Sequence, residues 1–139
     1  MSGYLLDTCV FAEYSKPRPN SNVFDWIDAQ EQEAQFISVL SIGEMQRGIS
    51  RLPSSRRKNS LEAVLESIVT RFDRRIIQLD ISILRRWGRM IGELELKGRK
   101  LPVVDSLIAA TALEHDLTII TQNTSDFADT NALVLDIWK

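Results

Sequence analysis

The stretch Leu101-Pro102-Val103-Val104-Asp105-Ser106-Leu107-Ile108-Ala109-Ala110 continues as Thr111-Ala112-Leu113, almost without a polar face. A helix that is apolar nearly all round is a buried helix, so this segment is predicted to run through the core. Because proline seldom lies inside a helix, the helix is expected to begin after Pro102. Asp105 then stands at its start, either as the N-cap or as a carboxylate free for chemistry.

Short apolar segments typical of strands alternate with segments of helical periodicity along the whole chain. This alternation predicts a three-layer α/β/α sandwich with a small, mostly parallel sheet. No linker or repeat divides the chain, so a single domain over residues 1–139 is expected. The predicted helices at 61–72 and 81–94 resemble an α-hairpin insertion, with apolar stripes that suit either a core edge or a dimer interface. The predicted strands are residues 4–6, 36–40, 76–79, 117–121 and 133–135.

The composition is that of an ordinary globular domain, with 44% hydrophobic and 26% charged residues in 139. No apolar run is long enough to cross a bilayer, and an acid at position 7 comes too early for a signal peptide. The single cysteine, Cys9, excludes an internal disulfide, so a cytoplasmic location is expected. The single histidine argues against a histidine-rich zinc site. With a net charge of −2, any nucleic-acid contact must come from a local basic patch.

Three other acids stand, like Asp105, just beyond the end of a predicted strand: Asp7, Glu44 and Asp126. In open α/β sheets, ligands bind beyond the carboxyl ends of the strands, so the four are predicted to meet in one cleft. Local structural roles are the alternatives. Asp7 suits a turn that bonds to its own backbone, and Glu44 suits a capping box with Ser41 at a helix start.

Four carboxylates at close range repel one another, and a divalent cation relieves that repulsion. Mg²⁺ or Mn²⁺ prefers carboxylate and water oxygens in octahedral geometry. Such an ion binds phosphates and activates water, which points to hydrolysis of a phosphodiester. The sequence holds no Ser-His-Asp set, Gly-rich phosphate loop or CxxC motif that would favour other chemistry.

The ordered set of motifs resembles the PIN-domain nucleases, and in particular the VapC-type toxins of bacterial toxin–antitoxin pairs, with the nearest likeness to the FitB-like group. The resemblance implies an α/β/α sandwich, a homodimer, Mg²⁺ or Mn²⁺ dependence, and endoribonuclease activity inhibited by a VapB-like antitoxin, in a heterotetramer or a larger assembly. It rests on Leu5-Leu6-Asp7-Thr8, Ser41-x-x-Glu44, Val104-Asp105-x-x-Ile108-Ala109-Ala110, Thr121-x-Asn123-x-x-Asp126-Phe127 and Asp136-Ile137-Trp138.

The resemblance also implies a role for each acid. Asp7 and Asp105 would be the principal metal ligands, and Asp126 would complete the site directly or through water. Glu44 would position or deprotonate the attacking water, or hold a metal-bound water.

The same resemblance assigns supporting roles to Thr8, Thr121 and Asn123, which would orient the carboxylates. Gln122 is a departure, because these proteins often carry arginine at that position. The missing charge could have balanced the site or contacted the antitoxin, so the difference bears more on partner contacts than on catalysis.

Several basic residues are candidates for contacts with RNA phosphates, although charged residues of this kind are more often plain solvated surface. One alternative function is a PIN-like nucleic-acid-binding module without catalysis, acting through a DNA-binding partner. Another is a receiver-like domain in which Asp80 accepts a phosphoryl group, but it leaves Asp105 without a role. The candidate RNA contacts are Arg47, Arg51, Arg56, Arg57, Arg99 and Lys100.

Overall fold

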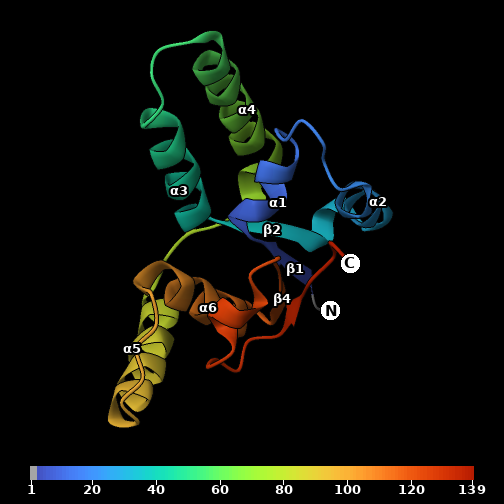
Figure 1. The fold of residues 1–139 in the computed structure, drawn as a ribbon. Coiled ribbons are helices and arrows are strands. Elements are labelled where there is room, and N and C mark those ends of the chain that lie inside the picture. The colour runs from blue at the N-terminus through green and yellow to red at the C-terminus, as the bar shows by residue number, and fades with distance from the viewer. Residues whose placement is uncertain (1–2) are drawn as a thin grey trace.

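The structure, a computed structural model, describes residues 3–139 (Figure 1). Its centre is a five-stranded sheet in the order β3-β2-β1-β4-β5, in which every neighbouring pair is parallel. The predicted α/β fold with a parallel sheet is therefore confirmed. The strands are β1 (Gly3–Leu6), β2 (Gln35–Ser38), β3 (Ile76–Ile77), β4 (Leu117–Ile120) and β5 (Val134–Leu135).

Helices cover both faces of the sheet, and the alternation of side chains along β1 shows how the layers form. Leu6 packs with Val10 and Val23 on one face, whereas Leu5 packs with Ile108 on the other. All of these side chains are buried, as period-two strands between two helical layers require. The helices are α1 (Thr8–Glu13), α2 (Ser21–Ala29), α3 (Val39–Ser50), α4 (Arg56–Phe72), α5 (Ile81–Leu96) and α6 (Val103–His115).

The first strand lies in the middle of the sheet, with β2 on one side and β4 on the other. Gly3 is needed there, because a Cβ at this position would come within 2.6 Å of the Ala34 carbonyl oxygen. Since all the strands are parallel, the carboxyl ends of β1, β2 and β4 lie at one edge of the sheet. That edge receives the residues that follow Leu6, Ser38 and Ile120.

The buried central helix is α6, as predicted from its composition. The side chains of Ser106 and residues 108–112 are buried, and the helix fills one face of the sheet. It begins at Val103, with Pro102 at the N-cap position, so Asp105 lies in the first turn and is not the cap. Of the two roles considered for Asp105, the N-cap is therefore wrong, and its carboxylate is not used in that way. None of the helices in residues 3–139, α6 included, is both long and apolar enough to span a membrane.

The alternative of a capping box at Ser41 is also wrong, because the N-cap of α3 lies three residues earlier, at Ser38. The Ser38 hydroxyl accepts a 3.1 Å hydrogen bond from the Leu40 amide and caps the helix. The predicted strand at 36–40 therefore ends at Ser38, and Ser41 is buried within α3. Glu44 is left on the second turn, where it is free to contact another element.

The predicted hairpin of the two helices at 61–72 and 81–94 is a further correction. Strand β3 separates α4 from α5, so α4 pairs with α3 and α5 pairs with α6 (Figure 1). Asp80 is the N-cap of α5 and accepts a 2.9 Å hydrogen bond from the Ile83 amide. This structural role for Asp80 argues against the receiver-like alternative. Gly98, with φ of 73°, follows the end of α5 as predicted.

Candidate functional site

The four predicted acids come from four elements that meet at the carboxyl edge of the sheet. Asp7 directly follows β1, Glu44 lies on α3 beyond β2, and Asp105 is in the first turn of α6. Asp126 lies in the 3₁₀ helix η3 (Thr124–Phe127), beyond β4. The charges of the other three acids all raise the pKa of Asp105, so the four share one region of the molecule.

Asp7 is held by two hydrogen bonds and is almost completely buried. Its Oδ1 accepts from the Thr8 amide at 2.9 Å, which makes it the N-cap of α1, and its Oδ2 accepts from the Thr121 hydroxyl at 2.9 Å. Burial raises the pKa of Asp7 and the Asp126 charge adds to that, whereas the bonds from Thr121 and Thr8 oppose it. The turn interaction with its own backbone does occur, together with the long-range bond.

Glu44 is half-buried and is fixed by Thr8. The Thr8 hydroxyl donates a 3.0 Å hydrogen bond to Glu44 Oε1, so one threonine contacts Asp7 through its amide and Glu44 through its side chain. Burial raises the pKa of Glu44, and the nearby Asp7 charge adds to this increase. The Thr8 hydrogen bond and the positive charge of Arg47 act in the opposite direction.

Asp105 differs from the other two because no residue in the described range 3–139 donates a hydrogen bond to its carboxylate. Partial burial raises its pKa to about 6, and the charges of Asp126, Asp7 and Glu44 contribute. This carboxylate is therefore the one whose negative charge the protein stabilises least. Such a perturbed group in a cluster of like charges is a candidate functional residue.

Asp126 is exposed, and the loop before it contacts Asp7 through Thr121. The Thr121 hydroxyl accepts a 3.1 Å hydrogen bond from the Asn123 amide while it donates to Asp7. The Asn123 side chain itself is exposed and makes no hydrogen bond to another residue of the described chain. The loop thus orients Asp7 through the Asn123 backbone, and the Gln122 amide donates to the Cys9 thiol at 3.5 Å.

Comparison with known proteins bears directly on this arrangement. The PIN domain matches residues 4–133, which is nearly the whole chain.

The chain belongs to the PIN-domain family.

Several relatives of this PIN domain match it over almost their entire length. The toxin FitB of Neisseria gonorrhoeae is 32% identical over 96% of this chain and 97% of its own. The VapC ribonuclease Y4jK of Sinorhizobium fredii is 27% identical over 97% of both chains. In the solved structure of FitAB bound to an IR36 DNA fragment, a chain 31% identical superposes with a TM-score of 0.90, over 98% of this chain and 96% of that one.

The donor chemistry of this PIN domain fits a hard divalent cation, since the cluster offers only carboxylate and hydroxyl oxygens. Among residues 3–139, no three Asp, Glu, His or Cys side chains already lie in an arrangement that could hold a metal ion. Binding a cation would therefore draw these carboxylates closer together than they lie in the structure. The carboxylates of Asp105 and Asp126 accept no hydrogen bond within the described residues, so both could move toward a cation without breaking one.

A contact that the sequence did not reveal holds the first turn of α6. The Trp87 indole N–H donates a 2.8 Å hydrogen bond to the buried Ser106 hydroxyl, which donates in turn to the Val103 carbonyl at 2.7 Å. Because α6 has no side-chain N-cap, this relay from α5 fixes the turn that carries Asp105. Trp87 fitted the apolar stripe of its helix, and nothing in the sequence marked it as a partner of Ser106.

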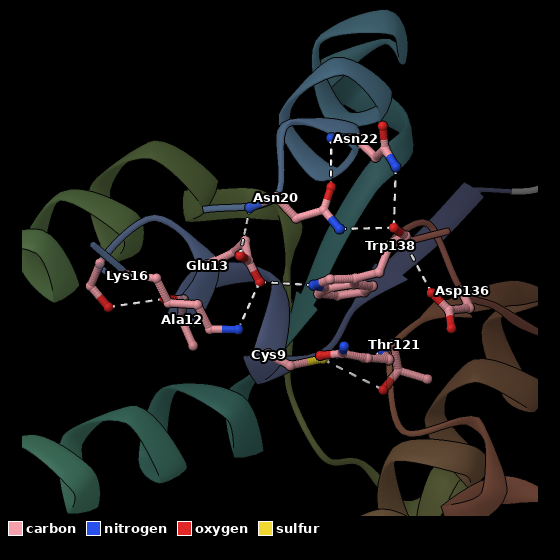
Figure 2. A network of polar contacts seen from close by, with 11 residues as sticks. Cys9, Ala12, Glu13, Lys16, Asn20, Asn22, Thr121, Asp136 and Trp138 are labelled. Atoms are coloured by element: carbon pink, nitrogen blue, oxygen red, sulfur yellow. Dashed lines mark hydrogen bonds and ion pairs between the residues drawn. The ribbon is translucent and has the colours of Figure 1, made fainter. Parts of the chain in front are cut away.

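A buried carboxylate at the far end of α1 is the second feature that the sequence did not reveal. Glu13 accepts hydrogen bonds from the Trp138 indole at 2.8 Å, the Asn20 backbone amide at 2.8 Å and the Lys16 ammonium at 3.0 Å (Figure 2). These three bonds lower the pKa of Glu13 to about 2, against the effect of burial. The network joins α1 to the end of the chain, because the Asn20 and Asn22 side chains both donate to the Trp138 carbonyl.

Proposed function

We propose that this PIN domain is a Mg²⁺- or Mn²⁺-dependent endoribonuclease and the toxin of a toxin–antitoxin pair. The observation that carries the proposal is the convergence of Asp7, Glu44, Asp105 and Asp126 at the carboxyl edge of the sheet, with two of them oriented by Thr8. Full-length similarity to a toxin and to a VapC ribonuclease supports it. The cytoplasm, where RNA is abundant, is the proposed location.

The residues of the chain divide the work of hydrolysis between them. Asp7, Asp105 and Asp126 would hold the ion, which when bound offsets phosphate charge and acidifies water. Thr8 occupies Glu44 Oε1, so Oε2 is the oxygen that would accept a proton from the attacking water. The raised pKa of Glu44 brings it closer to neutrality and suits it to that transfer. Thr121 keeps Asp7 from rotating away from the cluster.

The same cluster suggests how an antitoxin would inhibit the enzyme. A basic side chain of the partner placed among the four acids would neutralise them and exclude the ion. A separate recess of about 620 Å³ between α1, α2 and α4 offers apolar surface for the rest of a partner segment. Leu6 and Val10 line it, on either side of Asp7, so a partner bound there would lie close to the cluster.

A homodimer is part of the proposal, and α5 offers the surface for it. Ile81, Leu84 and Leu96 are exposed on that helix, at 76%, 44% and 90% of their maximum. Ile81 and Leu84 lie one turn apart, so their exposed side chains form an apolar patch that a second copy of the chain would cover. Sedimentation of the purified chain would give its mass in solution.

The decisive experiment is cleavage of RNA by the purified protein with Mg²⁺, with Mn²⁺ and with a chelator. Wild type should cleave only with metal, and Asp7→Asn and Asp105→Asn should lose at least about a hundredfold in rate, since each removes a ligand charge. Asp25→Asn, an exposed aspartate on α2, is the matched control and should cleave like wild type. Equal cleavage by all four proteins would overturn the catalytic assignment. No cleavage by wild type, with intact binding to a DNA-bound partner, would favour the non-catalytic module.

A further inference from the structure

Helices α3 and α4 form an arm that extends from the sheet. They lie side by side and project beyond it, and residues 51–55 join them at the far end (Figure 1). Glu44 lies in the half of α3 nearer the sheet, and Arg51 caps the helix at the tip. One face of this arm therefore begins at the acidic cluster and leads away from it.

That face of α3 carries cations at helical spacing. Arg47, Gly48 and Arg51 follow Glu44 at i+3, i+4 and i+7, so the four share one side of the helix. At a rise of about 1.5 Å per residue, Arg47 lies about 4.5 Å and Arg51 about 10 Å beyond Glu44 along the axis. Both arginines are exposed, and a Cβ built on Gly48 would have nothing within 4 Å, so the face is open.

These arginines are free to bind a ligand, as are several other exposed cations of the described chain, whereas five basic side chains are already engaged. Within the described residues 3–139, the side chains of Arg47, Arg51, Arg56 and Arg57 make no ion pair and no hydrogen bond. By contrast, Arg99, considered from the sequence as an RNA contact, pairs with Asp129. The other engaged cations bind acids or backbone carbonyls: Lys16 with Glu13, Arg86 with Glu114, Lys58 with Leu52, and Arg75 with Gln32 and Gln35.

We propose that Arg47, Gly48 and Arg51, continued at the tip of the arm by Arg56 and Arg57, form a track that binds the RNA backbone next to the bond cut at the acidic cluster. The inference rests on the proposed ribonuclease function, which makes RNA the substrate. A chain with net charge −2 cannot attract RNA as a whole, so the phosphates need a local set of cations. Because Gly48 has no side chain, the RNA backbone can approach the helix closely between the two arginines.

Arg47 and Arg51 also suit a purely structural role, and the experiment must distinguish that role from RNA binding. Cations in the last turn of a helix offset its dipole, which would give Arg47 and Arg51 a role in stability alone. In that case substitution lowers the thermal midpoint and leaves RNA binding unchanged. The track predicts the reverse, with a change in salt-dependent binding at constant fold.

Binding is measured with a labelled single-stranded RNA in the Asp7→Asn background, so that affinity is read without cleavage. Arg47→Gln/Arg51→Gln should weaken binding at least tenfold and reduce the slope of log Kd against log salt by about 1.4, since each phosphate contact on a single strand contributes about 0.7. Arg47→Lys/Arg51→Lys should restore most of the affinity. Arg18→Gln/Arg74→Gln removes the same charge from exposed sites elsewhere and is the matched control.

Two outcomes would overturn the track. One is equal RNA affinity in the Arg47/Arg51 and Arg18/Arg74 double variants, since the effect would then be general charge. The other is unchanged RNA binding with a weakened antitoxin complex, which would assign the face to a protein partner. Both are distinguishable from failure of the proposed function, because wild-type protein would still cleave RNA with metal in either case.

Discussion

The Thr121 hydroxyl donates a 2.9 Å hydrogen bond to Asp7 Oδ2 and joins two residues that are 114 positions apart. Both side chains are buried, and both follow neighbouring strands of the sheet, β4 and β1. The same hydroxyl accepts from the Asn123 amide, so it ties the loop that carries Asp126 to the carboxylate at the start of α1. The pairing of two strands thereby sets the orientation of a proposed metal ligand.

Thr121→Val should impair metal binding more than it impairs folding. Valine keeps the shape but leaves Oδ2 of a buried carboxylate without its donor, which costs about 1–3 kcal/mol of unfolding free energy. With Asp7 free to rotate, the affinity for Mn²⁺ should fall about tenfold or more. Calorimetric titration and urea unfolding give the two quantities. Thr118→Val, at a half-buried position within β4 whose side chain makes no hydrogen bond in the described chain, should change neither affinity nor stability to that extent.

Asp105→Asn should stabilise the metal-free protein at neutral pH. The folded-state pKa of Asp105, about 6, lies above its ordinary value of 3.8, so the folded protein binds the proton more tightly than the unfolded chain does. Stability therefore falls as pH rises from about 4 to about 6, and the loss persists above that window. Because the group is largely solvent-screened, the gain on substitution should be about 1 kcal/mol or less.

The test is urea unfolding with a chelator at several pH values between 4 and 8. The variant should show a smaller decrease in stability across the window than Asp25→Asn or wild type. A variant less stable than wild type at pH 7 without metal would contradict the repulsion that the acidic cluster implies. With saturating Mn²⁺ the order should reverse, since only wild type has the full set of carboxylates.

Glu13→Gln should weaken the protein above pH 5 and flatten its response to acid. The folded-state pKa of Glu13, about 2, lies below its ordinary value of 4.5, so its ionised form contributes stability that is present above about 4.5 and lost as pH falls towards 2. The side-chain amide of the glutamine also places its own N–H donor against a second donor, either the Trp138 indole or the Asn20 backbone amide. This costs about 1–3 kcal/mol of unfolding free energy. Unfolding curves from pH 2 to 7 measure this. Glu66→Gln, on an exposed part of α4, should follow wild type.

Trp87→Phe should affect metal binding although the side chain lies on α5, away from the acids. Phenylalanine keeps a ring in place but removes the N–H that holds the Ser106 hydroxyl, so the first turn of α6 and Asp105 gain freedom. We expect Mn²⁺ affinity to fall about tenfold. Ser106→Ala should give a similar loss and the double variant little more, because both break one relay. Trp26→Phe, whose indole N–H has no partner in the described chain, is the control; an equal loss there would remove the positioning role.

The sequence was most informative where the pattern is local. The all-apolar run at 103–113 predicted the buried helix, and Gly98 marked the end of α5, because periodicity and backbone freedom are properties of a short segment. It was least informative about partners. Two serines, Ser38 and Ser41, precede α3, and the sequence favoured the wrong one as the cap because Glu44 completes the expected motif. The actual partner of Glu44 is Thr8, 36 residues away.

The other long-range contacts could not be predicted either, because they depend on tertiary packing and not on local sequence. The Trp87–Ser106 bond and the Glu13–Trp138 bond span 19 and 125 residues, and each depends on how separate elements pack. The parallel order of the strands predicted that the acids would gather at one edge, which the mutual effects on their pKa values support. It could not predict that one threonine would serve both Asp7 and Glu44, since that requires the relative placement of α1 and α3.

The position of β1 between β2 and β4 has a consequence for how the protein comes into being on the ribosome. The first strand is synthesised early, but its edge toward β4 stays unpaired until residues 117–120 have been translated. Glu13 gains its hydrogen bond from Trp138 only when synthesis is almost complete. A nascent chain that has reached α5 carries Asp7 and Glu44 but neither Asp105 nor Asp126. If the protein is the ribonuclease proposed above, a product that ends before α6 would lack two of the four acids and would not cleave RNA, so activity would arise only when synthesis is nearly complete.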